Sequence, residues 1–342
     1  MDNFIFKELL TYITSKSRYF EKIKKRIESD KILYLTGLTH SARSFFTSYI
    51  INTINRPVLI IAPDIANSLK YYSECNIFTD YSIEYLPSLE VSPYEMVFHD
   101  PITIAKQNNI LDLFQNRKIK AIVTPAKNLL CTYPSSDMVD NNTIYLSLNT
   151  TIDLYELSKK LTEIGYKRVV MVADPGEYSL RGDILDIYPM SDDPVRIEFF
   201  GDEIESLRVF NIDSQRSIRT VDSIKIKPCY KIVVKEEQKT EFINKIRDIH
   251  QNQSAELQDF HKEALNDTVN SIISAFEENT YFEGIEYFLP LFEKKPRDLS
   301  DYLPENTLII IHESAESGQK LYIQDEKYKK EYQINVKEGL SL

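Results

Sequence analysis

Residues 174–211 read DPGEYSLRGDILDIYPMSDDPVRIEFFGDEIESLRVFN, and this stretch decides how the middle of the chain folds. Its apolar runs YSLRGDILDIYP, PVRIEFFGD and EIESLRVFN are separated only by turn residues such as DPGE and MSDDP. Consecutive strands with no room for a crossover helix between them pair antiparallel. Further short runs, YKRVVMV and DSIKIKP, flank this stretch, and a helical pattern at IDLYELSKKLTEIG precedes them all. The spacing therefore predicts an α+β domain with an antiparallel sheet over residues 132–226.

Outside this domain, strand-like apolar runs alternate with helix-like segments. The strand-like runs are KILYLTG (31–37), RPVLIIAPD (56–64), SIEYLPS (82–88), KAIVTPA (120–126) and TLIIIHE (307–313). Helical spacing marks residues 65–78 and 103–116, and also the first thirty residues. Such alternation is typical of an α/β fold with a parallel sheet, in which TLIIIHE is expected as a buried strand. The sequence thus predicts an α/β module in two parts, residues 1–131 and 227–342, interrupted by the inserted antiparallel α+β domain.

The sequence GLTHSARS at residues 37–44 has the frame of a phosphate-binding loop with altered chemistry. A working P-loop, G-x-x-x-x-G-K-[ST], wraps phosphates with backbone N–H groups and the start of a helix. Gly37 and Ser44 keep this frame, but Ala42 replaces the second glycine and Arg43 replaces the lysine. A methyl group crowds the phosphate, and a guanidinium is not equivalent to an ammonium. These residues alone leave two interpretations open: a damaged phosphate-binding loop, or an ordinary turn with a helix N-cap.

Composition narrows the class of protein. The chain has 342 residues, 42% of them hydrophobic, which is enough for the cores of two or three domains. A net charge of −11 argues against nonspecific nucleic-acid binding, which requires an excess of Lys and Arg. The three cysteines form no C-x-x-C pair and only five histidines are present, so we expect no metal, no cofactor and a reducing cytoplasm. No apolar run reaches the length of a membrane span, so no membrane partner is expected.

Several motifs between residues 174 and 217 together resemble one family. They are Gly176-Glu177-Tyr178, Arg181-Gly182-Asp183, Asp186-Ile187-Tyr188-Pro189, Arg196 through Ser206, and Asp213 with Gln215-Arg216-Ser217. This set is similar to the domain shared by the bacterial excision-repair protein UvrB and the transcription-repair coupling factor (Mfd). The later stretch YFEGIEYFLP (281–290), followed by DYLPEN, is closer to the coupling factor. The resemblance covers about residues 31–313 and implies an N-terminal UvrB-like region with a degenerate P-loop NTPase-like fold.

The resemblance also bears on the altered loop. In UvrB, the strand after the inserted domain ends in an Asp-Glu pair that handles magnesium and water opposite the P-loop. At the matching place this chain has His312 and Glu313. A neutral imidazole is a poor ligand for magnesium, which prefers oxygen donors. The resemblance therefore implies a relic nucleotide site that no longer binds ATP or metal, formed by Gly37, Ala42, Arg43, Ser44, His312 and Glu313.

For the inserted domain, the resemblance implies binding of UvrA, the damage-recognition ATPase. Three arginines of this domain in UvrB contact UvrA, and carried over singly they fall on Arg168, Ser179 and Arg181. Arginine suits such a contact because its planar fork binds carboxylates through two parallel hydrogen bonds. Arg168 and Arg181 are thus the expected contacts, while Ser179 departs from the pattern. The alternative for each arginine is an ordinary surface ion pair, which contributes about 0 to 1 kcal/mol.

The expected function is that of a non-catalytic adaptor that recruits UvrA to stalled RNA polymerase. In the family, RNA polymerase and DNA are bound by downstream domains that also carry the motor, so the chain is expected to be an N-terminal fragment. One alternative is an active ATP-dependent helicase subunit of the UvrB type, which needs a working nucleotide site and a DNA-clamping hairpin. The matching stretch LPSLEVSPYEMVFHDPI (86–102) has one tyrosine and no Lys or Arg. A further alternative is weak DNA binding through KKPR (294–297).

Overall fold

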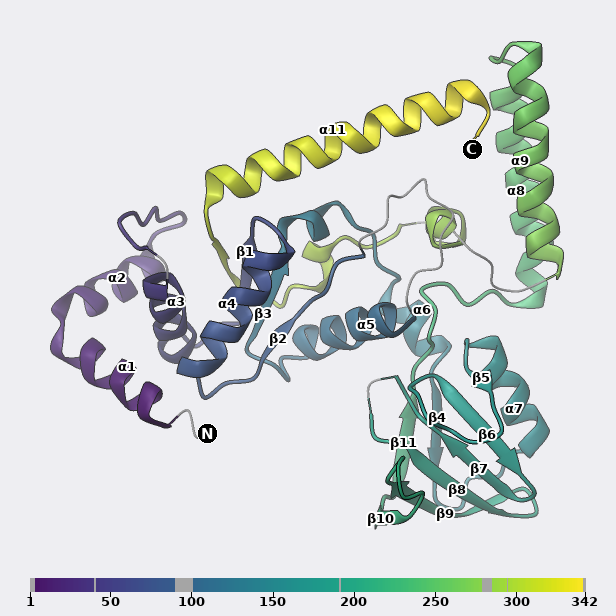
Figure 1. Cartoon of the computed structure of the whole chain (residues 1–342), viewed down its shortest axis with the longest axis horizontal. Helices are drawn as coiled ribbons and strands as arrows, with labels where there is room; N and C mark the ends of the chain where they lie inside the picture. The colour runs from purple at the N-terminus through teal and green to yellow at the C-terminus, as the bar shows by residue number, and fades with distance from the viewer. Residues whose placement is uncertain are drawn as a thin grey trace. The chain divides into compact units, whose positions relative to one another are not determined.

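The computed structural model of the chain describes residues 4–39, 41–89, 101–190, 192–278, 285–293 and 295–340 (Figure 1). The chain divides into two units that each consist of several segments. The first unit comprises Met1–Ser88, Ile110–Cys131 and Asp298–Asp325. The second unit comprises Leu89–Asn109, Thr132–Arg297 and Glu326–Leu342. Each unit contains its own main β-sheet.

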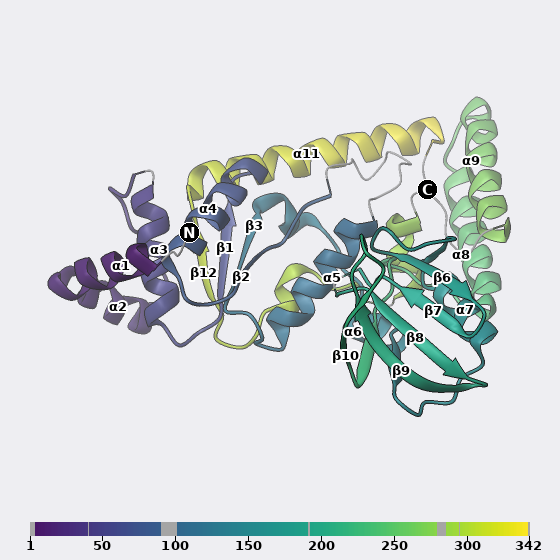
Figure 2. The same cartoon turned by 60° about the horizontal axis from the view of Figure 1, so that its bottom comes forward.

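A four-stranded parallel sheet forms the centre of the first unit (Figure 2). Its strands, in spatial order, are β12 (Leu308–Ile311), β1 (Val58–Ala62), β3 (Ala121–Pro125) and β2 (Ile83–Tyr85). All five residues of β1 and of β3 are buried, as expected for the central strands of a parallel sheet. The predicted parallel sheet is therefore confirmed, with four of the five strand-like runs in it.

The prediction of a fifth strand at KILYLTG, residues 31–37, is wrong. This segment has no strand pairing, and the exposed fractions of Ile32 and Tyr34 are 72% and 81%. Leu33 nevertheless packs in the same apolar cluster as Ile310 of β12. Only one side of this apolar run packs in a core. The segment is therefore held by Leu33 without forming a buried strand. The prediction for TLIIIHE also needs correction, because β12 is an edge strand whose Ile311 is 52% exposed.

Helices of the first unit pack on this sheet or on one another. They are α1 (Phe4–Lys16), α2 (Arg18–Ser29), α3 (Ser41–Thr53) and α4 (Ile65–Phe78), with the short 3-10 helices η1 (Ala126–Leu130) and η3 (Leu299–Tyr302). Helix α5 (Pro101–Gln115) confirms the helix expected at 103–116. Helix α4 starts where the Asp64 side chain accepts a hydrogen bond from the Asn67 backbone N–H at 2.8 Å. This N-cap satisfies a backbone group that the helix itself leaves unpaired.

A six-stranded sheet forms the main body of the second unit (Figure 1). In spatial order its strands are β10 (Ser217–Thr220), β9 (Glu203–Phe210), β8 (Val195–Phe200), β7 (Ile184–Ile187), β6 (Glu177–Arg181) and β5 (Lys167–Arg168). Every pair is antiparallel except β5 with β6. A separate antiparallel pair joins β4 (Ile144–Ser147) to β11 (Ser223–Ile226). The predicted antiparallel sheet is confirmed, although the run YKRVVMV contributes only two residues to it.

The two faces of this sheet differ in chemistry. One face packs against α7 (Leu154–Glu163), whose Leu157 and Leu161 share an apolar cluster with Leu185 and Ile197. Successive residues of a strand point to opposite faces, so the residues between these apolar ones lie on the other side. We call that side the outer face; along β6 to β9 its charged residues are Glu177, Arg181, Asp186, Arg196, Glu198, Glu203 and Arg208. The outer face is therefore the polar surface of the sheet.

The remaining elements lie mainly in the second unit. They are α6 (Ser136–Asn141), α8 (Glu236–Ser254), α9 (Asp259–Glu278), η2 (Ile285–Phe288), α10 (Leu289–Phe292) and α11 (Ser314–Glu338). Helices α8 and α9 lie side by side (Figure 1), and the rings of Phe242 and Phe276 meet at a centroid distance of 4.1 Å. Among the described residues, no helix combines the length and the apolar character that crossing a bilayer requires.

Candidate functional site

The start of α3 is occupied by a carboxylate of the chain itself. Ser41 and Ser44 donate side-chain hydrogen bonds to the two carboxylate oxygens of Glu74 on α4, at 3.2 and 2.5 Å. Ser44 is fully buried. The first turn of a helix attracts negative charge because its N–H groups point outward and its dipole is positive there. Glu74 thus supplies the anion for the two serine side chains at this helix start.

Arg43 is likewise committed to contacts within the chain. Its Nε donates to the Leu38 carbonyl at 2.9 Å, and its Nη1 donates to the Tyr71 hydroxyl at 3.4 Å. The same nitrogen forms an ion pair with Glu313, which directly follows β12 and His312. The hydrogen bond to Tyr71 and the nearby Glu313 carboxylate raise the pKa of Arg43. The guanidinium therefore stays charged, and its charge is already balanced.

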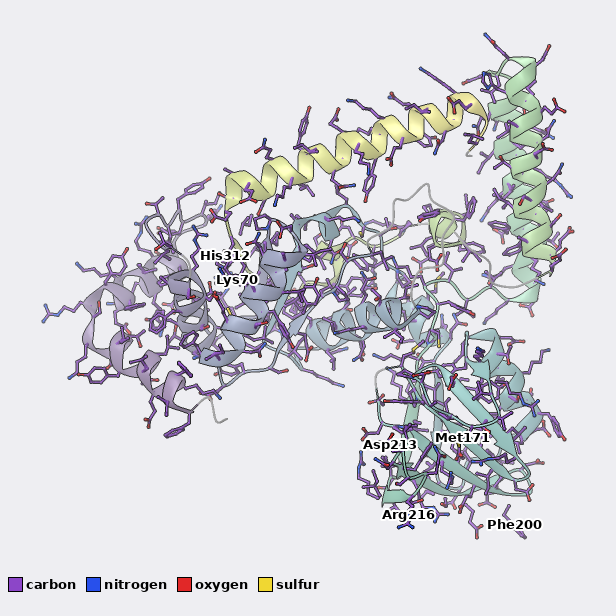
Figure 3. The ribbon with its side chains drawn as sticks, in the orientation of Figure 1. Lys70, Met171, Phe200, Asp213, Arg216 and His312 are labelled. Atoms are coloured by element: carbon purple, nitrogen blue, oxygen red, sulfur yellow. The ribbon has the colours of Figure 1, made fainter. Side chains whose placement is uncertain are left out.

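His312 fills the space between α3 and α4 at the end of β12 (Figure 3). Its ring stacks on Tyr71 with centroids 4.0 Å apart and planes 15° from parallel. Its Nε2 lies 3.2 Å from the Thr47 hydroxyl. Burial, with the positive Arg43 as a second cause, lowers the pKa of His312 to about 4. The imidazole is therefore neutral at pH 7 and packs as a core residue.

The fold thus brings together the predicted nucleotide-site residues Arg43, Ser44, His312 and Glu313. Each has a partner within the first unit. Glu74 and Tyr71 complete the network, although no sequence motif pointed to them. Gly37 has a φ of +87°, but a Cβ placed on it would meet no atom within 4 Å. Within the part of the chain that the structure describes, no three His, Cys, Asp or Glu side chains are grouped to hold a metal ion.

On the outer face of the six-stranded sheet, one buried carboxylate holds two arginines. Asp186 is 1% exposed and accepts hydrogen bonds from Arg196 at 2.7 and 2.9 Å and from Arg181 at 2.5 Å. The Arg196 side chain is 18% exposed and lies over the Phe210 ring at 5.1 Å. The Arg181 side chain is 50% exposed. Arg181 is therefore oriented by Asp186 and still open to a partner.

The other two predicted contact positions lie on β5 and β6. Arg168 is exposed and is level with Tyr178 in the β5–β6 pair, three positions before Arg181 along β6. Ser179 is 1% exposed, and its hydroxyl donates to the Val170 carbonyl at 2.8 Å. The structure therefore sets Arg168 and Arg181 on neighbouring strands, but Ser179 ties down the segment after β5 and is closed to a partner.

Comparison with known proteins finds a family that this domain resembles. Residues 144–231 match the family model described as the UvrB interaction domain. We use that name below for this part of the chain. The match runs from β4 through β11 and includes the whole six-stranded sheet, with Arg168, Arg181 and Asp186 inside it.

The similarity to known proteins extends on both sides of the UvrB interaction domain. The transcription-repair-coupling factor of Bacillus subtilis (strain 168) is 32% identical over 329 residues, which are 94% of this chain and 28% of that protein. The Escherichia coli (strain K12) coupling factor is 28% identical over 81% of this chain and 23% of its own length. UvrABC system protein B of Thermotoga neapolitana is 28% identical, over 82% of this chain and 46% of its own length. The predicted UvrB-like region of the coupling-factor type is confirmed.

The chain covers only part of each relative, about a quarter of the two coupling factors and under half of UvrABC system protein B. The similarity supports the parallel sheet and the UvrB interaction domain, while the relation to P-loop NTPases stays a prediction. The stretch matched to the DNA-clamping hairpin of UvrB includes residues 90–100, which lie outside the described residues.

Proposed function

We propose that this chain is a non-catalytic adaptor that binds UvrA through Arg181, on the outer face of its UvrB interaction domain, and through Arg168, at the edge strand β5. The observation that carries this proposal is Arg181, half exposed and held by the buried Asp186 within that domain. A guanidinium fixed in this way loses little side-chain freedom on binding, which lowers the entropic cost of a contact. Arg168, exposed on the neighbouring strand, is the second proposed contact.

The name of the relatives gives the adaptor its context. Coupling factors are named for linking transcription to repair. In this proposal the chain supplies the UvrA-recruiting part of such a link. Contacts with RNA polymerase and with DNA, and the motor activity, belong to other parts of the coupling factors.

The nucleotide site is proposed to be a relic that serves as scaffold. Glu74 supports this view because it satisfies both Ser41 and Ser44, so an incoming phosphate would meet a carboxylate instead of free donors. Arg43, paired with Glu313, has no free charge to offer to a phosphate. His312 is buried and neutral at pH 7, and a neutral imidazole is a poor magnesium ligand. ATP binding would require all of these contacts to be broken.

Isothermal titration calorimetry of this chain with purified UvrA tests the proposal. We expect Arg181→Ala to weaken binding at least tenfold, equivalent to about 1.4 kcal/mol. Arg219→Ala is the matched control, because Arg219 is also ion-paired and its side chain is 57% exposed, on the edge strand β10. A parallel titration with magnesium-ATP should give no binding heat. Saturable ATP binding with no UvrA binding would instead support an active subunit of the UvrB type.

A further inference from the structure

Phe200 is an aromatic side chain left in solvent at the end of β8. It is 79% exposed, whereas its neighbour Phe199 is 5% exposed and packs in the core against α7. Strand alternation explains why one of these two side chains points outward. It does not explain why the side chain that points outward is apolar. The position directly precedes the turn at Gly201, which has a φ of +62°.

Phe200 lies at the same end of the sheet as Arg181. Strands β6 and β8 both run antiparallel to β7, so their C-terminal ends lie together. Arg181 pairs with Ile184, which in turn pairs with Glu198, two residues before Phe200. Two strand spacings and two residues of rise separate the Cα atoms of Arg181 and Phe200 by about 12 Å.

A backbone contact fixes this end of the sheet. The Phe199 N–H donates to the Asp183 carbonyl at 2.9 Å, which ties β8 to the turn that follows Arg181. Figure 3 shows Phe200 at the opposite end of β8 and β9 from Asp213 and Arg216, which follow β9. Phe200 and Arg181 therefore form one rigidly placed pair and not two unrelated surface residues.

The acidic side chains around Arg181 are already paired. Three arginines of the outer face, Arg181, Arg196 and Arg208, are held by two carboxylates, Asp186 and Glu198. The outer face also carries Glu177 and Glu203, at the start of β6 and opposite Phe200. Asp186 is fully committed to Arg181 and Arg196, and Glu198 is paired with Arg208.

We propose that Phe200 is a second anchor of the partner-binding surface, beside Arg181. The partner surface would then offer an apolar pocket for the ring and a carboxylate for the guanidinium. This inference rests on the proposed UvrA binding and adds the residue that contributes apolar burial to it. Aromatic and arginine side chains are the commonest residues with large effects on binding, and phenylalanine buries a large area with few rotatable bonds.

Binding of purified UvrA to four forms of the full chain tests this proposal: wild type, Phe200→Ala, Phe200→Leu and Tyr155→Ala. Tyr155 is the matched control because it is 78% exposed and lies on α7, which covers the opposite face of the sheet. We expect Phe200→Ala to weaken binding at least tenfold, Phe200→Leu to recover most of that loss, and Tyr155→Ala to change binding less than twofold. Unchanged melting temperatures would exclude unfolding as the cause.

Salt dependence separates the two anchors. Arg181→Ala should make binding less sensitive to salt, whereas Phe200→Ala should weaken binding equally at 50 and 300 mM salt, because apolar burial is not screened. If Arg181→Ala weakens binding and Phe200→Ala changes it less than twofold, the Phe200 inference is wrong and the proposed function stands. If the wild-type chain does not bind UvrA, both are wrong.

Discussion

Asp186→Asn probes the buried carboxylate that holds Arg181 and Arg196. The substitution keeps the size of the side chain but removes its charge, so two guanidinium groups lose their shared anion. The Arg196 side chain is 18% exposed, and removing one partner of a buried ion pair costs about 3–5 kcal/mol. The Arg181 side chain is 50% exposed, so its share is about 0–1 kcal/mol. Because the amide can still accept one hydrogen bond, we take the low end, about 3 kcal/mol.

Hydrogen–deuterium exchange suits this measurement because it reports opening region by region in a chain with two units. A loss of about 3 kcal/mol corresponds to exchange roughly 100-fold faster, since about 1.4 kcal/mol is a factor of ten. We expect this acceleration in peptides covering β7 and β8 and no change in peptides covering β1 of the first unit.

The matched control is Asp193→Asn. Asp193 also pairs with an arginine, but the two side chains are 63% and 57% exposed, so the change should stay within about 0.5 kcal/mol. An acceleration below about fivefold in β7 and β8 for Asp186→Asn would refute the reasoning. It would mean that water or a shift of Arg196 compensates for the lost carboxylate.

Three further predictions concern other parts of the chain. Burial lowers the pKa of His312 to about 4 from its usual 6.5, so the unfolded chain takes up this proton at a higher pH than the folded chain does. Between pH 7.5 and 5, the free energy of unfolding measured in urea should therefore fall by about 2 kcal/mol more for the wild type than for His312→Gln. Gly165→Ala should destabilise the second unit by at least about 1 kcal/mol, because Gly165 has a φ of +99° and a Cβ there would lie 2.6 Å from the Tyr230 ring. Gly318→Ala in α11 should instead stabilise its helix by up to about 1 kcal/mol. Thermal melts measure both changes. Iodoacetamide at pH 8 should label only Cys131 in the native chain, because the other two cysteines are buried; mass spectrometry that finds a second labelled site would contradict the described packing.

The two central strands of the parallel sheet could be predicted from the sequence. β1 and β3 are short apolar runs bounded by proline or polar residues, and both form as expected. The run at residues 31–37 has the same composition but remains unpaired, because composition does not reveal whether a strand has neighbours to pair with. The same limit applies to β12, which is apolar throughout but pairs on one side only.

The candidate sites were predictable only in part, for a related reason. The residue types at Ala42, Arg43 and His312 already indicated lost nucleotide chemistry, and the structure brings Arg43 and His312 together with Ser44 and Glu313. Glu74 could not be found, because it is 30 residues from Ser44 along the chain and no spacing rule links a helix start to the next helix. Phe200 could not be singled out, because Phe199 and Phe200 are adjacent in the sequence and only the structure tells which of the two is exposed.

The pairing of β1 with β12 has a consequence for how the chain folds during synthesis. Val58 lies opposite Leu308, 250 positions later, so the parallel sheet cannot close until Leu308 has left the ribosome. Every strand pair of the six-stranded sheet falls between Lys167 and Thr220, so that sheet has all its strands much earlier. Domains generally fold as units in the order in which they emerge, and distant pairings are slow because a long loop must first be closed. The UvrB interaction domain should therefore form first, while the edge of β1 that pairs with β12 is still unpaired. During this interval a nascent chain would most need a chaperone.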